Sequence, residues 1–322
     1  MIIDIKEIGL FCDKSVSALN AENKVSVELH VVKEFQTKLE CVSRLAVSLD
    51  DSLWIGQGEQ KKGVRIFGSH TGLQNVKTVG KKIHVISSLN ILTHGISVTP
   101  NNDLLIVTEG TRLKQIKNQS NKITDTVFDF QPYQPQAVHV TRENKIIVGV
   151  CDDSDTSLVL LFVMNHEGNQ ERVYGEDKTK NISFTAISRI TDTSNGNIFL
   201  VDTTDITEFY GNVKVLGMDT IINTYSGNTV INTEVKLFTP ISLATTPADN
   251  VIIADIDSNV LHILNSSGEL ITFINTFEKG IDGPHSICLA MAGQFCILYI
   301  GTSTNIASKD KSKLYKLSIV GI

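Results

Sequence analysis

A repeated unit of four short strands is the feature that most constrains how this chain can fold. Its clearest copy includes residues 250–277, where three apolar runs are separated by turns rich in Asp, Asn, Ser and Gly. Runs of four to eight aliphatic residues between such turns predict antiparallel strands joined as hairpins. One more short run at 240–246 completes a meander of four strands. A unit of this size cannot bury its own faces, so the copies must pack against one another.

The same unit recurs along the whole chain. The second strand of each copy is expected at 53–55, 104–107, 146–148, 198–201, 251–254 and 295–300. The shorter strand before it is expected at 45–48, 96–99, 138–141, 188–191, 243–246 and 287–290. A repeat of about 40 to 50 residues is typical of propeller blades. The sequence therefore predicts an all-β, six-bladed β-propeller.

The two ends of the chain are expected to close this ring. After residue 284 the last unit has only three expected strands, whereas residues 25–35 alternate like a strand ahead of a first unit that already has four. We therefore expect residues 25–35 to complete the last blade and pair with residues 313–319, which leaves no edge open there. The chain then divides into an extension or linker at residues 1–23 and one propeller domain at residues 24–322.

Composition narrows the class of protein. The 322 residues are 41% hydrophobic, which suffices for a core, and the net charge of −6 counts against nonspecific nucleic-acid binding. No apolar run is long enough to span a membrane, and the first residues lack the pattern of a secretory signal. Five cysteines without a CxxC motif indicate a reducing compartment. We expect a cytoplasmic protein without membrane contact, monomeric as an isolated domain.

One family resemblance is visible in the blades. Residues 254–264, ADIDSNVLHIL, resemble an NHL repeat, and residues 94–98 with 103–109, and 284–289, resemble its first half. Residues 32–37 followed by 53–56 are similar to the divergent C-terminal propellers of invertebrate tripartite-motif proteins. The resemblance covers residues 24–322 and is carried by units two, five and six, because units three and four have lost the signature Asn and Gly positions.

This resemblance implies a recognition domain of the ubiquitin pathway. The paired Cys and His ligands of RING and B-box modules are nevertheless absent, because Cys12, Cys41, Cys151, Cys288 and Cys296 are scattered. We expect a non-catalytic module that binds a protein partner and uses no cofactor. RNA binding is one alternative, and a metal-dependent hydrolase or lyase with its site in the central channel is another.

The expected binding residues lie in loops on one propeller face. Lysines of the last and first units make one side of this face basic, and acidic residues of units three to five make the other side acidic. This polarity favours a protein partner over RNA laid across the face. The candidates are Lys61, Lys62, Glu109, Arg112, Asp152, Asp153, Asp155, Asp205, Asp257, Lys309 and Lys311.

Two histidines are candidates for the entrance of the channel. His94 and His285 occupy the same place in units two and six, at the start of the innermost strand. A metal site needs at least three convergent ligands, and we expect the other four units to contribute only poor ones. These expected equivalents are Ser43, Gln136, Ala186 and Ile241. We therefore expect no metal, and we expect His139 to pack between blades.

Overall fold

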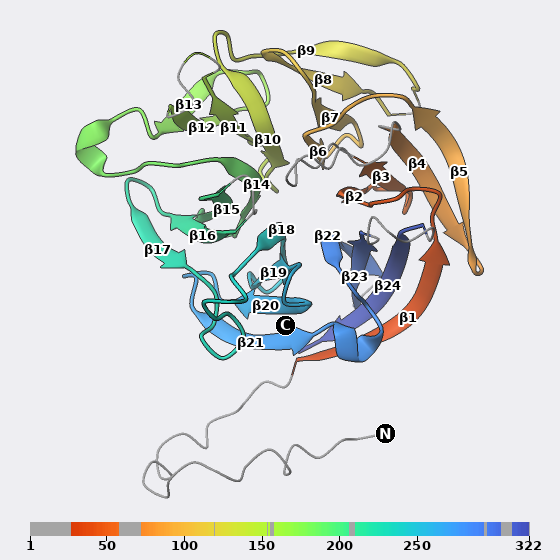
Figure 1. Cartoon of the computed structure of the whole chain (residues 1–322). Helices are drawn as coiled ribbons and strands as arrows, with labels where there is room; N and C mark the ends of the chain where they lie inside the picture. The colour runs from red at the N-terminus through yellow and green to blue at the C-terminus, as the bar shows by residue number, and fades with distance from the viewer. Residues whose placement is uncertain are drawn as a thin grey trace, which may run out of the picture.

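Six four-stranded antiparallel sheets surround one central axis in the computed structural model (Figure 1). The structure describes residues 27–57, 72–118, 120–152, 154, 158–205, 210–292, 295–303 and 311–321. Each sheet is one blade, and the first strand of each blade lies nearest the axis. The all-β, six-bladed propeller predicted from the repeats is confirmed.

The blades follow one another in chain order around the ring. Blade one contains β2 (Arg44–Val47), β3 (Leu53–Gln57), β4 (Gly72–Val79) and β5 (Lys82–Leu89). Blade two contains β6 (Gly95–Val98), β7 (Leu104–Val107), β8 (Arg112–Ile116) and β9 (Ile123–Asp129). Blade three contains β10 (Gln134–Val140), β11 (Ile146–Cys151), β12 (Val159–Met164) and β13 (Gln170–Tyr174).

The second half of the ring has the same order. Blade four contains β14 (Ile187–Asp192), β15 (Ile198–Thr203), β16 (Gly211–Leu216) and β17 (Ile221–Tyr225). Blade five contains β18 (Pro240–Thr245), β19 (Val251–Asp255), β20 (Val260–Leu264) and β21 (Leu270–Asn275). Blade six contains β22 (Pro284–Ala292), β23 (Phe295–Thr302), β24 (Lys313–Val320) and β1 (Glu28–Gln36). Two 3-10 turns, η2 (Lys178–Lys180) and η3 (Phe277–Lys279), lie between strands.

The N-terminal strand closes the ring as predicted. β1 pairs antiparallel with β24, with Leu29 opposite Ile319 and Phe35 opposite Leu314. Leu29 and Phe35 are both buried: Leu29 packs into the core between blades five and six, and Phe35 packs into the core between blades six and one. The predicted extension at residues 1–23 lies outside the described residues, and its role stays a prediction.

The core consists of apolar layers between neighbouring blades. The second strands β3, β7, β15 and β19 are buried along their whole length, because each is covered by a blade on both sides. Phe199 and Val201 of blade four, for example, pack with Leu243 and Ile253 of blade five. Trp54 packs with Leu104 and Ile106 of the next blade.

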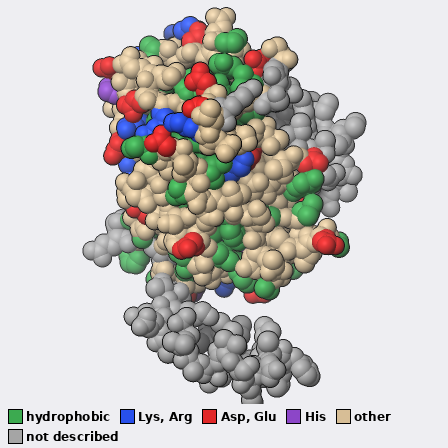
Figure 2. Space-filling view, turned by 90° about the vertical axis from the view of Figure 1, so that its left-hand side faces the viewer, with side chains coloured by type: hydrophobic (Ala, Val, Ile, Leu, Met, Phe, Trp, Pro, Cys, Tyr) green, Lys and Arg blue, Asp and Glu red, His purple; other side chains and the backbone are tan. Residues whose placement is uncertain are grey.

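Charges lie mixed on the outer rim of blades three and four (Figure 2). Pairs such as Lys145 with Glu171 and Lys180 with Asp219 lie on this rim, and exposed pairs of this kind contribute little stability. Among the described residues, no helix has the length and apolarity needed to cross a bilayer. The cytoplasmic location expected from the sequence stays a prediction.

Candidate functional site

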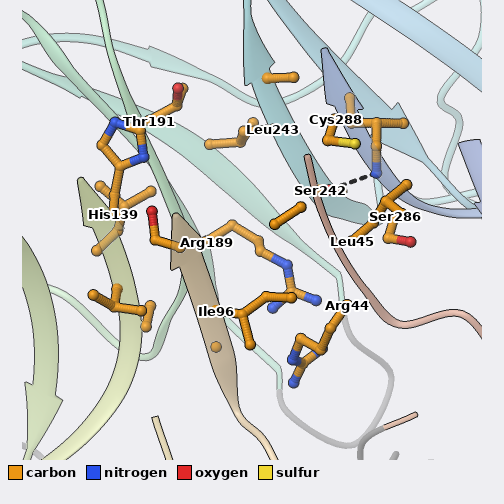
Figure 3. Close-up of a pocket in the computed structure, with 18 of the residues that line it drawn as sticks. Arg44, Leu45, Ile96, His139, Arg189, Thr191, Ser242, Leu243, Ser286 and Cys288 are labelled. Carbon is orange, nitrogen blue, oxygen red and sulfur yellow. Dashed lines mark hydrogen bonds between the residues drawn. The ribbon is translucent and has the colours of Figure 1, made fainter. Parts of the chain in front are cut away.

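The six innermost strands surround a cavity of about 300 Å³ on the propeller axis (Figure 3). One position of the inner strand recurs in all six blades: it is the first residue paired with the second strand in blades one and two, and the first residue after a bulge in the other four. At this level four blades carry small residues and two carry arginine. In chain order the six are Arg44, Gly95, Ala137, Arg189, Ser242 and Ser286.

The two arginines belong to blades one and four, which face each other across the ring (Figure 1). The Arg189 side chain crosses the channel, and its Nη2 donates to the carbonyl oxygen of Ser43 at 3.1 Å. Arg44 Nη1 donates to the same oxygen at 2.9 Å. The two guanidinium groups therefore converge on one acceptor and lie close together at one end of the cavity (Figure 3).

Two titratable groups lie near the arginines and carry no compensating charge. Burial raises the pKa of the Cys41 thiol to about 12 although both guanidiniums favour the thiolate, so Cys41 stays neutral. Burial, together with Arg189 and Arg44, holds the pKa of His285 well below its usual range, so its imidazole stays neutral as well. Burial also lowers the pKa of Arg189 to about 10, which leaves it charged at neutral pH.

A histidine and a carboxylate occupy the other end of the inner strands. His139 Nε2 on β10 lies 2.6 Å from Asp192 Oδ1 on β14, and both side chains keep about a fifth of their surface exposed. A carboxylate only accepts hydrogen bonds, so Nε2 donates to Asp192, and in the neutral imidazole Nδ1 keeps a lone pair. Within the part of the chain that the structure describes, no hydrogen-bond partner of Nδ1 is found. This arrangement can act as a general base held in place by a carboxylate.

Hydrogen bonds between neighbouring inner strands hold the cavity wall. Ser97 Oγ accepts from the Val140 amide, Ser242 Oγ accepts from the Ile287 amide, and Ser286 Oγ donates to the Val42 carbonyl. The Thr191 and Thr245 hydroxyls are 2.7 Å apart. Each of these hydrogen bonds links two adjacent blades, so the site is built on rigid elements rather than on loops.

The mouth of the cavity near His139 carries a third arginine. Arg142 reaches from blade three to blade five, where its Nη2 donates to the Thr246 carbonyl at 3.1 Å, and it lies 3.9 Å from Asp249. The cavity wall thus has three arginines and one carboxylate, Asp192. A cationic channel within an acidic protein favours the entry of anions.

The two candidate histidines lie near the arginine end of the channel, but neither is part of the cavity wall. His285 is 1% exposed, and neither ring nitrogen has a hydrogen-bond partner. His94 is partly buried, and its backbone amide donates to the Val107 carbonyl. The equivalent residue in blade four is Ser188, not Ala186 as expected, because the inner strand of that blade bulges between Ile187 and Arg189.

His139 has more than the packing role that the sequence predicted. It does lie between two blades, and it contacts blade four through Asp192, but it also lines the cavity. The sequence analysis missed Arg44, Arg189 and Asp192. Aligning the inner strands residue by residue would have revealed the two arginines, because the other four blades have Gly, Ala or Ser at that position.

The predicted loop residues that the structure describes do not line this cavity. Lys61, Lys62, Asp153, Asp155 and Lys309 lie outside the described residues. Of the others, Arg112 pairs with Asp129 within blade two, Lys311 lies 3.4 Å from Glu40, and Asp257 accepts from the Thr239 hydroxyl. Asp152 caps the Ser154 turn, Glu109 is exposed in the turn before β8, and Asp205 follows β15. Their role in binding stays a prediction.

The described residues bring together no group of three or more His, Cys, Asp or Glu side chains that could hold a metal ion.

No family model matches the chain, and no curated protein matches it in sequence. Solved structures show the same fold. The PQQ-bound aldose sugar dehydrogenase of Streptomyces coelicolor matches with a TM-score of 0.65 and 11% identity over 92% of this chain and 99% of its own. A luciferin-regenerating enzyme matches with a TM-score of 0.58 and 8% identity, over 92% of this chain and 96% of its own. A catalytically inactive virginiamycin B lyase of Staphylococcus aureus, with quinupristin, has a TM-score of 0.51 and 15% identity over 92% and 100%.

These likenesses correct one expectation. The sequence predicted a module without catalysis, whereas the similar propellers include dehydrogenases and lyases, so the non-catalytic interpretation is contradicted. The physical reason for the error is that a propeller core looks alike whether or not its channel holds reactive groups. An NHL or tripartite-motif relationship and a place in the ubiquitin pathway are not shown. The expected protein partner and the RNA alternative stay predictions.

Proposed function

We propose that the protein is an enzyme of the lyase or hydrolase class whose active site is the central cavity. The observation that carries this proposal is the pair His139 and Asp192, with 2.6 Å between Nε2 and Oδ1, on the wall of a cavity of ligand size. Asp192 fixes the imidazole so that Nδ1 can take a proton. The three similar structures named above are all propellers of enzymes, which supports the proposal.

The reaction follows from what one oriented base can do. As a lyase, His139 Nδ1 takes a proton from a carbon next to a carbonyl, and the C–H electron pair forms a double bond. The bond to the leaving oxygen then breaks, and this oxygen takes its electron pair and the proton from the imidazolium. As a hydrolase, the same nitrogen takes a proton from water while the water oxygen attacks a carbonyl carbon. The bond from this carbon to the leaving oxygen or nitrogen then breaks, and the leaving atom takes its electron pair and the proton from the imidazolium. The rigid wall of inner strands supplies the orientation that either reaction needs.

The blades themselves fit an NHL-like relationship, which we keep as part of the proposal. In the motif at residues 254–264, Asp255 is buried and its Oδ1 accepts from the Thr239 and Ser258 amides. This carboxylate holds the blade turn together. Its role is structural, and it does not bear on the reaction in the cavity.

The first prediction tests the dyad with a pool of small carbonyl compounds incubated in D2O. Mass spectrometry would detect deuterium incorporation or elimination products for a lyase and the mass of added water for a hydrolase. We expect His139→Gln to lower the rate about 100-fold or more, which is the usual share of an oriented general base. Asp192→Asn should lower kcat while KM changes little, because Asp192 orients the base and does not bind substrate.

The matched control is His84→Gln, which replaces an exposed histidine on β5 and should keep the full rate. Parallel assays with a chelator separate base catalysis from a metal-dependent version of the same reaction. The proposal is wrong if no compound in the pool changes, or if His139→Gln retains the wild-type rate.

A further inference from the structure

The guanidinium pair formed by Arg44 and Arg189 has no compensating negative charge among the described residues. Neither side chain forms an ion pair with a carboxylate there, and the Cys41 thiol beside them is buried and neutral. Cations taken out of bulk water are normally paired with an anion, because their desolvation is otherwise costly. Two such cations converging on the single Ser43 carbonyl make that cost larger.

Several hydrogen-bond donors of the pair also lack an acceptor. A guanidinium presents a planar fork of N–H groups that matches an oxyanion. Arg44 uses Nη1 for the Ser43 carbonyl, while its Nε is buried without a partner. Arg189 uses Nη1 for the Ser188 carbonyl and Nη2 for Ser43. Nearby, both ring nitrogens of His285 are buried without partners as well.

The room for a ligand comes from the other four blades. At the level of the two arginines they carry Gly95, Ala137, Ser242 and Ser286, and large side chains there would fill the space around the guanidiniums. A Cβ at Gly95 would lie 3.3 Å from both Val107 Cγ2 and the Val138 amide nitrogen, so the packing between blades two and three keeps this position small. The cavity is therefore open at the level where its charge is concentrated, and it is continuous with the wall that carries His139.

We propose that Arg44 and Arg189 bind an oxyanion, a carboxylate or phosphate, carried by the substrate of the cavity. This inference rests on the proposed function and names the class of its substrate. Arg189 and His139 differ by two residue levels of the inner strands, about 7 Å along them. The guanidiniums point away from His139 (Figure 3). The oxyanion is thus an anchor at one end of the substrate. The reacting carbon lies at least about 7 Å from this anchor.

The second prediction tests the anchor by binding alone, with no turnover. Isothermal titration of the full chain with butyrate, or with inorganic phosphate, against chloride at equal ionic strength should show one saturable site. Arg44→Met and Arg189→Met should each weaken binding by about tenfold to 100-fold, the usual effect of losing a charge-assisted hydrogen bond. Arg189→Lys should recover part of the affinity, because it keeps the charge and loses the fork.

Controls separate this inference from the proposed reaction. Arg112→Met removes an exposed arginine that pairs with Asp129, and it should leave anion binding unchanged. His139→Gln should bind the anion like wild type, because it removes only the base. Preference for phosphate or for butyrate identifies the source of the oxyanion. Equal binding by wild type and the Arg44→Met and Arg189→Met variants, or no saturable binding of either probe, would overturn the inference. Circular dichroism of each variant establishes that it is folded.

Discussion

At the residue scale, identical positions in the repeat have diverged into different chemistry. The start of the inner strand is small in four blades and arginine in the two opposite ones. Two residues further along the inner strand, His139 of blade three meets Asp192 of blade four. The repeat supplies six equivalent backbone positions around one axis, and single substitutions at them are enough to turn a packing position into a reactive one.

His285 shows how a buried titratable side chain beside the two arginines affects stability. It is 1% exposed, and burial beside Arg189 and Arg44 keeps it neutral in the folded protein, with its pKa well below the usual range. In the unfolded chain a histidine has a pKa of about 6.5. Below that pH the unfolded state binds more protons than the folded state, so the free energy of unfolding must fall as the pH falls.

The third prediction follows from this fall in the free energy of unfolding at low pH. His285→Leu should remove the proton uptake on unfolding, so its stability should depend less on pH between the folded and unfolded pKa values. The difference in slope is at most about 1.4 kcal/mol per pH unit for one group. Urea titrations at pH 5 and pH 7.5 would measure it, with His84→Gln as the exposed control. Parallel slopes for wild type and His285→Leu would contradict the burial argument.

At the element scale, the N-terminal strand matters most because it completes a blade formed from both ends of the chain. β1 adds an outer strand to β24, and its two buried side chains fill the core on both sides of blade six, Leu29 toward blade five and Phe35 toward blade one. Lys313 and Glu34 also pair across these strands at 2.7 Å, but an exposed pair contributes little. The stabilisation comes from the backbone ladder and the two apolar side chains.

The fourth prediction is that deleting residues 1–36 exposes the edge of β24 and uncovers this core. We expect aggregation, or a loss on the order of 5 kcal/mol, because two large buried side chains are removed together with a strand. Deleting only residues 1–20 should change the melting temperature little. Thermal unfolding and light scattering of the two truncated chains test this prediction. A chain lacking residues 1–36 that stays monomeric with an unchanged Tm would contradict it.

At the scale of the whole molecule, closure makes the blades dependent on one another. Each apolar layer belongs to two blades, as in the layer of Phe199, Val201 and Leu243 between blades four and five. A substitution that removes packing from one layer therefore affects both adjoining blades. The ring can close the resulting gap only by moving whole blades. The cavity inherits this rigidity, because its wall consists of the inner strands of all six blades.

The fifth prediction concerns this shared core. Phe199→Ala should destabilise the protein by about 3–5 kcal/mol, because the side chain is fully buried and the close-packed blades cannot collapse onto the gap. Phe295→Ala is the matched control, since Phe295 lies on β23 with 68% of its surface exposed. Urea denaturation of both variants gives the comparison, and equal losses would show that burial between blades is not what sets stability.

The number of blades, their order and the closing strand were predictable from the chain, because they depend on local patterns. Apolar runs, turn residues and a missing fourth strand are all readable along the chain, and β1 with β24 formed as expected. The boundaries were less accurate: the second strand of unit three was expected at residues 146–148, whereas β11 extends to Cys151.

Only the tertiary structure decided which residues form the site. Arg44 and Arg189 are 145 positions apart, and they meet because a six-bladed ring places blades one and four on opposite sides of a narrow channel. His139 and Asp192 meet because their blades are neighbours, at a register set by a bulge in each inner strand. Distances between blades depend on ring geometry and strand register, and neither is encoded in a local run of residues. For this reason the fold was predictable from the chain, while the chemistry of its channel was not.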